Sequence, residues 1–383
     1  MHKEKVYLRA IRTLAENKQR RENGGYNCIP FGLPRFGQYI PGVQKKNYTI
    51  VTASSGVGKS KFVKQLYVLN PHEFVNAHPE ANMKLDILYF CLEESAENFI
   101  HSVICHKLNI DYEERIDIKS LKSVKLEHIL SDEELAKVET LKPWLDDFEE
   151  RVTLVDDVKN PYGIYKTAKD FIEARGEWVY KEIPWTQEDG SIQIKRVKDY
   201  FQMAHPDHYV MIVVDHVSLL QPEKGMAGLH EAMSKLSSDY ALILRDKYHA
   251  SVVFVQQQMA EQEKKQFTNA GKSVESKLEP TLQGLADNKL TQRDADEAIG
   301  VFAPNRYEIP EYRGYDITKL KDNYRCGIIL KSRDGEANIR GHFFFDGAVS
   351  RFDELPKAAD MNQEQYEYCA NRVGRSVNTI TFS

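Results

Sequence analysis

Little in this chain ties it to an oxidising compartment or to a membrane. Its five cysteines are scattered and odd in number, and no two form a Cys-x-x-Cys pair. This spacing argues against a disulfide framework or a structural zinc site, and it favours a reducing cytosol. No apolar run approaches the roughly 18 residues that a membrane-spanning helix needs, and the charged residues after Met1 do not resemble a signal peptide. We therefore expect a cytoplasmic protein without a membrane partner.

The chain also lacks an excess of positive charge. Its formal net charge is −5, so any contact with nucleic acid has to be local. Its 383 residues allow one large domain or two ordinary ones. Hydrophobic residues make up 42% of the sequence, which suffices for a substantial core.

The most informative segment is Ala-Ser-Ser-Gly-Val-Gly-Lys-Ser at 53–60. It follows a β-like run at 48–52 and precedes a helical pattern, which is the context of a phosphate-binding P-loop. In such a loop the backbone N–H groups surround the nucleotide phosphates, the lysine reaches the β- and γ-phosphates, and the serine binds Mg²⁺. We expect ATP and Mg²⁺ as cofactors. The expected contacts are Ser55, Gly56, Val57, Gly58, Lys59 and Ser60.

Strand-like and helix-like patterns alternate along most of the chain. Apolar strand patterns at 85–90, 152–155, 210–214 and 251–255 are separated by helical ones. This alternation predicts an α/β fold with a mostly parallel central sheet flanked by helices. Four further strand patterns after residue 296, separated by Asp-Gly turns, predict antiparallel strands near the C-terminus.

We expect three parts along the chain. They are an N-terminal helix and linker at 1–45, the α/β domain at 46–355, and a C-terminal tail at 356–383. The helix is either a solvated tail or an arm that docks on a neighbouring subunit. Within the α/β domain, the pattern at about 177–197 predicts an inserted hairpin, and the polar composition at about 261–289 predicts a mobile loop.

Acidic residues follow two of the apolar strands. Asp215 ends the strand at 210–214, where a P-loop ATPase holds a Mg²⁺-side carboxylate, so Ser60 and Asp215 are the expected metal residues. The alternative is a cap after a core strand. Glu93 follows the strand at 85–90 and could orient the attacking water, whereas Glu93 and Glu94 could also simply favour the start of the next helix.

Polar residues at two further strand ends are candidates for contact with a γ-phosphate. Three glutamines at 256–258 end the strand at 251–255, and one of them could sense the phosphate, unless all three are only a polar strand end. Lys331 and Arg333 project the same way from a later strand and could stabilise charge as an arginine finger. A solvated edge strand protected by charge explains the same pair.

The polar segment at about 261–289 carries cations that suit phosphate contacts with nucleic acid. A solvated loop is the plainer explanation. The candidate residues are Lys264, Lys265, Lys272, Lys277 and Lys289.

Taken together, these motifs resemble the RecA-like motor domain of DnaB-type hexameric replicative helicases of the phage type, over roughly residues 32–352. The P-loop, the strand ending in Glu93, the strand ending in Asp215 and the later Lys-x-Arg pair all occur in the family's order. The resemblance implies that Glu93 is the catalytic glutamate and that Gln257 senses the γ-phosphate. It also implies that Lys331 and Arg333 act on the ATP of a neighbouring subunit in a hexamer that moves along single-stranded DNA.

The chain departs from this family pattern in three places. Ala53 replaces the first glycine of the P-loop and requires a negative φ, the hairpin at 177–197 is extra, and the first 45 residues leave no room for the family's separate N-terminal domain. A primase or a loader would then be a separate partner, and a phage-encoded protein would work in the host cytoplasm. Two other functions stay open, namely a RecA-type recombinase or mediator and a non-motor, ATP-dependent assembly regulator.

Overall fold

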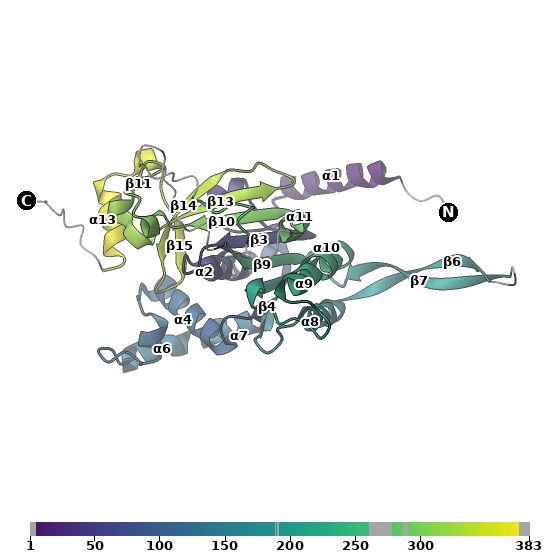
Figure 1. The fold of residues 1–383 in the computed structure, drawn as a ribbon, viewed down its shortest axis with the longest axis horizontal. Coiled ribbons are helices and arrows are strands. Elements are labelled where there is room, and N and C mark those ends of the chain that lie inside the picture. The colour runs from purple at the N-terminus through teal and green to yellow at the C-terminus, as the bar shows by residue number, and fades with distance from the viewer. Residues whose placement is uncertain (1–4, 188, 190, 260–277, 286–289, 375–383) are drawn as a thin grey trace, which may run out of the picture.

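The computed structural model describes residues 5–187, 189, 191–259, 278–285 and 290–374. Its centre is a sheet of nine strands in the order β15-β14-β13-β10-β3-β9-β8-β4-β5 (Figure 1). The six strands from β10 to β5 are parallel, whereas β10, β13, β14 and β15 pair antiparallel in succession. This sheet confirms the predicted fold class. The strands are β3 Asn47–Ala53, β4 Lys84–Cys91, β5 Val152–Val155, β8 His208–Asp215, β9 Ser251–Gln257, β10 Glu297–Phe302, β13 Tyr324–Ser332, β14 Arg340–Asp346 and β15 Arg351–Glu354.

Helices cover both faces of the sheet because its central strands are apolar on both sides. Val213 of β8 packs with α2, α4 and α7, whereas its neighbour Ile212 packs with α8, α9 and α10. π-helical segments at Lys64–Leu69 and Lys235–Ala241 join α2 to α3 and α9 to α10. The helices are α2 Lys59–Val63, α3 Asn70–Ala77, α4 Ala96–Tyr112, α5 Ile118–Leu121, α6 Asp132–Thr140, α7 Lys142–Arg151, α8 Pro161–Glu173, α9 Leu229–Ser234, α10 Leu242–Tyr248 and α11 Leu290–Asp294.

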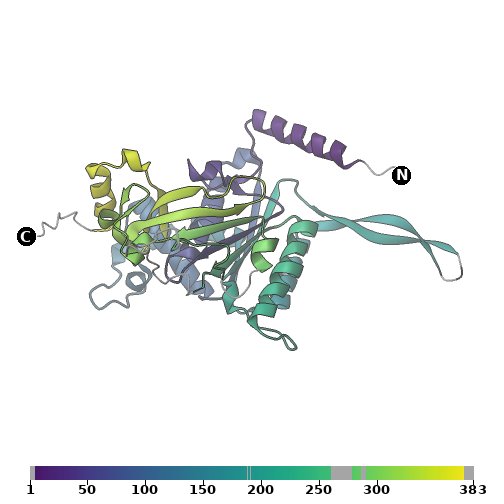
Figure 2. The same cartoon turned by 45° about the horizontal axis from the view of Figure 1, so that its top comes forward.

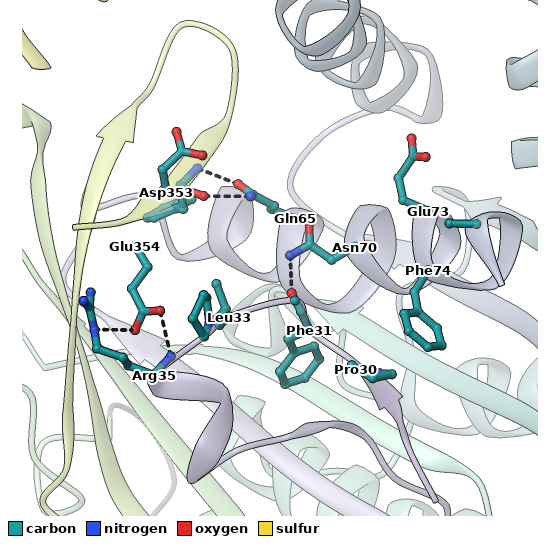
Figure 3. Close-up of a pocket in the computed structure, with 14 residues that line it drawn as sticks. Pro30, Phe31, Leu33, Arg35, Gln65, Asn70, Glu73, Phe74, Asp353 and Glu354 are labelled. Atoms are coloured by element: carbon teal, nitrogen blue, oxygen red, sulfur yellow. Dashed lines mark hydrogen bonds and ion pairs between the residues drawn. The ribbon is translucent and has the colours of Figure 1, made fainter. Parts of the chain in front are cut away.

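The segment before β3 differs from the linker that its prolines and glycines suggest. Its two short strands, β1 (Ile29–Pro30) and β2 (Gly42–Val43), pair with each other, and Phe31 and Phe36 are buried in the core. Asn70 donates to the Phe31 carbonyl over 2.7 Å, and the backbone N–H of Arg35 donates to Glu354 over 3.0 Å (Figure 3). Residues 29–43 are therefore part of the α/β core.

The residues expected to form a C-terminal tail also pack. A small sheet of β11 (Glu311–Tyr312) and β12 (Tyr315–Asp316) lies beside α12 (Ile317–Leu320) and α13 (Gln363–Asn371). Tyr366 and Cys369 of α13 are buried in a cluster with these elements. The described part of the region after residue 355 is thus a helical cap on the antiparallel side of the sheet.

The predicted inserted hairpin is present as a long two-stranded ribbon. Its strands are β6 (Gly176–Thr186) and β7 (Ile192–Met203), and its base packs on the core through Trp178 and Phe201. The ribbon and the exposed N-terminal helix α1 (Val6–Glu22) extend from the same end of the molecule (Figures 1 and 2). None of the described helices is long and apolar enough to cross a bilayer.

Candidate functional site

The P-loop has the backbone that phosphate binding requires. It connects β3 to α2, and Gly56 and Gly58 have φ values of 72° and 102°. A Cβ atom on Gly58 would lie only 3.0 Å from Cζ of Phe345, so a side chain there meets both strain and a clash. Ala53 is the last residue of β3 and is not among the residues with positive φ, so alanine fits at the position of the usual first glycine.

A cavity of about 530 Å³ opens at this loop. Lys59 is buried beside it, and burial lowers the pKa of its ammonium group, while the charges of Glu93 and Asp215 oppose that shift. Charged and polar groups therefore converge on one hollow at the carboxyl ends of β3, β4 and β8. Its lining includes Gly56, Gly58, Lys59, Ser60, Lys61, Lys64, Glu93, Glu94, Asp215 and Arg325.

The Asp215 carboxylate is held from two sides. Ser60 donates to one of its oxygens over 3.0 Å, and Tyr89 donates to the other over 2.6 Å. Burial raises the pKa of Asp215 to about 6, although these two hydrogen bonds favour its ionised form. A hydroxyl and a carboxylate at this spacing supply the oxygen ligands that Mg²⁺ prefers, so the residues fit the expected metal.

The two glutamates after β4 have different environments. Glu94 accepts from the Lys64 ammonium over 2.8 Å, and this ammonium also lies 4.3 Å from the centre of the Phe99 ring. Glu93 is exposed in the cavity and makes no hydrogen bond or ion pair with the described residues. Glu93 is thus the carboxylate that has room to orient a water molecule, a choice that sequence spacing alone left open.

The three glutamines after β9 also differ. Gln256 accepts from Thr291 over 2.8 Å, and Gln258 donates to Thr52 and to the Thr281 carbonyl over 3.0 Å each. Gln257 points to the opposite face and hydrogen-bonds the imidazole of His216, next to Asp215. Of the three, Gln257 therefore lies nearest to the candidate metal residue.

Lys331 and Arg333 lie away from the cavity of their own chain. Ser332, between them, pairs with Glu297, which pairs in turn with Thr49 near the start of β3, whereas the P-loop follows the end of β3. The Lys331 ammonium donates to carbonyls at the end of α11, and Arg333 pairs with Asp296 at 2.8 Å. Within one chain, the structure does not bring this pair together with the other site residues.

The lysines proposed to contact nucleic acid cannot be located. Lys264, Lys265, Lys272, Lys277 and Lys289 all lie outside the described residues. The described residues 278–285 within the predicted mobile loop are packed, with Leu278 and Leu285 buried. For those eight residues the prediction of a mobile loop is wrong, because Glu279 is fixed by Tyr312, Arg313 and Arg340.

No protein-family model and no curated protein sequence matches the chain. Among solved structures, a helicase-sized ATPase domain aligns with a TM-score of 0.66 and 15% sequence identity, covering 93% of this chain and all of that one. A DnaB-like replicative helicase, solved for its interactions with primase, aligns with a TM-score of 0.63 and 16% identity over 93% of this chain and 68% of its own. The chain has the fold of a DnaB-like helicase. The predicted resemblance is thereby confirmed at the level of the fold.

On this helicase fold, two arginines that no motif indicated support the P-loop. Arg325 of β13 is almost fully buried, and its Nε atom donates to the Val57 carbonyl over 2.7 Å. Arg306 donates to the Ser55 carbonyl. A single arginine inside the apolar pattern at 324–330 was the only sequence signal for the first, and the second had none.

Proposed function

We propose that this chain is the ATP-hydrolysing motor of a ring-shaped DNA helicase that moves along single-stranded DNA during replication. The observation that carries the proposal is the convergence of Lys59, Ser60, Asp215 and Glu93 on one cavity, within a fold shared with helicase motors. The active assembly is a homo-oligomer, expected to be a hexamer. A primase or a loader is a further candidate partner, and the domain boundaries at residues 45 and 355 belong to the proposal.

The chemistry follows from the positions of these groups. Bound Mg·ATP supplies the electrophilic phosphorus and a cation that neutralises the phosphate oxygens. Backbone N–H groups of residues 56–60 and the Lys59 ammonium hold the phosphates, while Ser60 and Asp215 hold the cation. Glu93 orients the attacking water and accepts its proton. In this scheme Lys59→Ala abolishes hydrolysis.

The coupling to DNA involves residues outside this cavity. Gln257 senses whether the γ-phosphate is present, and Lys331 and Arg333 complete the cavity of a neighbouring subunit. The lysines at 264, 265, 272, 277 and 289 grip the phosphates of the strand with little sequence preference. Neutralising Lys264, Lys265 and Lys272 together should weaken DNA binding and flatten its salt dependence.

The test is the rate of ATP hydrolysis with and without single-stranded DNA, on the wild type and on wild type mixed with Arg333→Ala. We expect strong stimulation by DNA, and a loss of activity larger than the fraction of variant added. Arg372→Ala, which removes a similar ion pair at 2.6 Å to Asp353 on another face, is the matched control. Lack of stimulation together with a proportional loss would favour an assembly regulator. Open filaments in the electron microscope would favour a recombinase.

A further inference from the structure

A second hollow, of about 280 Å³, lies on the antiparallel side of the sheet and shares no residue with the P-loop cavity. Four cationic side chains line it, namely Arg35, Arg313, Arg340 and Lys357. No carboxylate of the described residues lines it. In a chain whose net charge is −5, such a concentration of positive charge points to an anionic ligand.

The carboxylates behind this hollow do not neutralise it. Glu279 pairs with both Arg313 and Arg340, and Glu354 lies 3.7 Å from Arg35, so two buried carboxylates face four cations. Lys357 is exposed, and its ammonium makes no contact with the described residues. The Nε atom of Arg340 is buried, and within the described structure it has no acceptor. Hydrogen-bond donors thus remain for a ligand.

Aromatic rings form the rest of the hollow. The rings of Tyr315 and His342 lie 4.7 Å apart, and both line it together with Phe36. Tyr39 stands on the rim and is 42% exposed. Burial lowers the pKa of His342 to about 4, and the charges of Arg340, Arg35 and Arg313 lower it further, so the imidazole is neutral at pH 7. The surfaces available are therefore flat neutral rings beside cations.

We propose that this hollow binds a phosphate group together with its neighbouring base, either in a single strand of nucleic acid or in a free nucleotide. Cations that contact phosphate beside an exposed aromatic ring are the chemistry by which proteins hold single strands. The arginines supply donors to the phosphate oxygens, and Tyr39 supplies a face for the base. If the ligand is a DNA strand, the inference rests on the proposed helicase function and adds a contact outside the segment 261–289.

The experiment measures binding of the oligonucleotide (dT)12 and, separately, of dTMP to the full chain by calorimetry. Two variants are used, Lys357→Glu and Tyr39→Ala, because both residues are exposed and neither change removes a buried contact. Lys166→Glu on the exposed surface of α8 reverses a charge elsewhere and is the matched control. Circular dichroism and ATP binding should be unchanged in all three.

We expect Lys357→Glu and Tyr39→Ala each to weaken (dT)12 binding at least about fivefold, and Lys357→Glu to lower the salt slope by about 0.7. The control should change neither quantity. If dTMP binding falls in the same variants, the ligand is a free nucleotide, and if only (dT)12 binding falls, it is a strand. Unchanged binding of both ligands in both variants would overturn the proposal. A wild-type ATPase that DNA does not stimulate would overturn the helicase function instead, without touching this result.

Discussion

At the scale of single residues, the hydroxyl of Tyr89 is the clearest example of a group that acts through another. It donates to Asp215 over 2.6 Å from inside the core and fixes the carboxylate that is expected to hold Mg²⁺. Groups that orient a metal ligand typically contribute about 10- to 100-fold to metal affinity. We therefore expect Tyr89→Phe to raise the Mg²⁺ concentration needed for half-maximal ATPase activity about tenfold.

A matched variant separates this effect from loss of stability. The Tyr248 hydroxyl also donates to a carboxylate, that of Glu173, over 2.7 Å, but far from the cavity. Tyr248→Phe should leave the Mg²⁺ dependence unchanged. Equal Mg²⁺ curves for Tyr89→Phe and the wild type would show that the hydroxyl does not position Asp215.

His106 of α4 makes the stability of the protein depend on pH. Its imidazole lies 3.2 Å from the Val349 carbonyl, and burial lowers its pKa to about 4, from 6.5 when unfolded. Between these values the unfolded chain binds a proton that the folded chain does not, so this stability is present above pH 6.5 and is lost as the pH falls toward 4. At pH 5 the loss is about 2 kcal/mol. Urea denaturation at pH 7.5 and 5 should show it.

The variant His106→Gln supplies the comparison for this prediction. It removes the titrating group and retains a polar side chain, so its stability should fall less between the two pH values than that of the wild type. An identical fall in both proteins would assign the pH dependence to other groups.

The sequence placed most of the candidate site residues in the right region but could not separate neighbours. Glu93 and Glu94 are adjacent, and only the ion pair between Glu94 and Lys64 distinguishes them. In the same way, Gln257 differs from the glutamines beside it through partners such as Thr52, which is about 200 positions away in the chain. Such distinctions depend on contacts between distant residues, which local patterns do not contain.

At the scale of elements, the β6–β7 ribbon can be tested as a separable part. Tyr180 and Lys198 face each other in its register, so an Asn-Gly turn could join them in place of residues 181–197. Because the side chains beyond this point are largely exposed, we expect the shortened protein to keep its free energy of unfolding within about 1 kcal/mol. Urea denaturation measures this directly.

The base of the ribbon should behave in the opposite way. Trp178 packs against Phe201 and Tyr248, and its indole N–H donates to Glu173 over 2.8 Å. Trp178→Ala should therefore destabilise the protein by about 3 kcal/mol. If the shortened ribbon were as destabilising as Trp178→Ala, the outer part would belong to the folding unit.

Elements were predictable where burial follows from local composition. The run 210–214 is wholly apolar, and it forms β8 in the middle of the sheet. The segment 29–43 was missed because its two-residue strands and many turn residues look like a linker, although Phe352 and Glu354 lie beside it from the other end of the sequence. The helix expected from residue 131 to 144 is in fact two, α6 and α7, with Leu141 between them.

At the scale of the whole molecule, the separation between the P-loop cavity and Arg333 has a direct consequence. The two lie at opposite edges of the sheet, so a single chain cannot supply both to one nucleotide. Because an arginine finger typically contributes about 10³- to 10⁵-fold to hydrolysis, we expect the specific ATPase activity to rise at least about a hundredfold as the chains assemble. Activity and sedimentation should be measured over the same range of protein concentration.

The outcome for Arg333→Ala sharpens this prediction. The variant should sediment and bind nucleotide almost as the wild type does, yet its activity should stay low at every concentration. A wild-type specific activity that is independent of concentration, while the sedimenting species changes, would mean that each chain completes its own site.

The ribbon also gives the molecule a built-in optical label. The chain has three tryptophans, and two of them, Trp144 and Trp178, pack against the body of the protein. Trp185 stands on the outer part of β6, is 53% exposed and lies beneath the Lys195 ammonium. A water-borne quencher will therefore reach Trp185 before the others. Its emission can report what touches the ribbon while the rest of the motor turns over, with no dye attached.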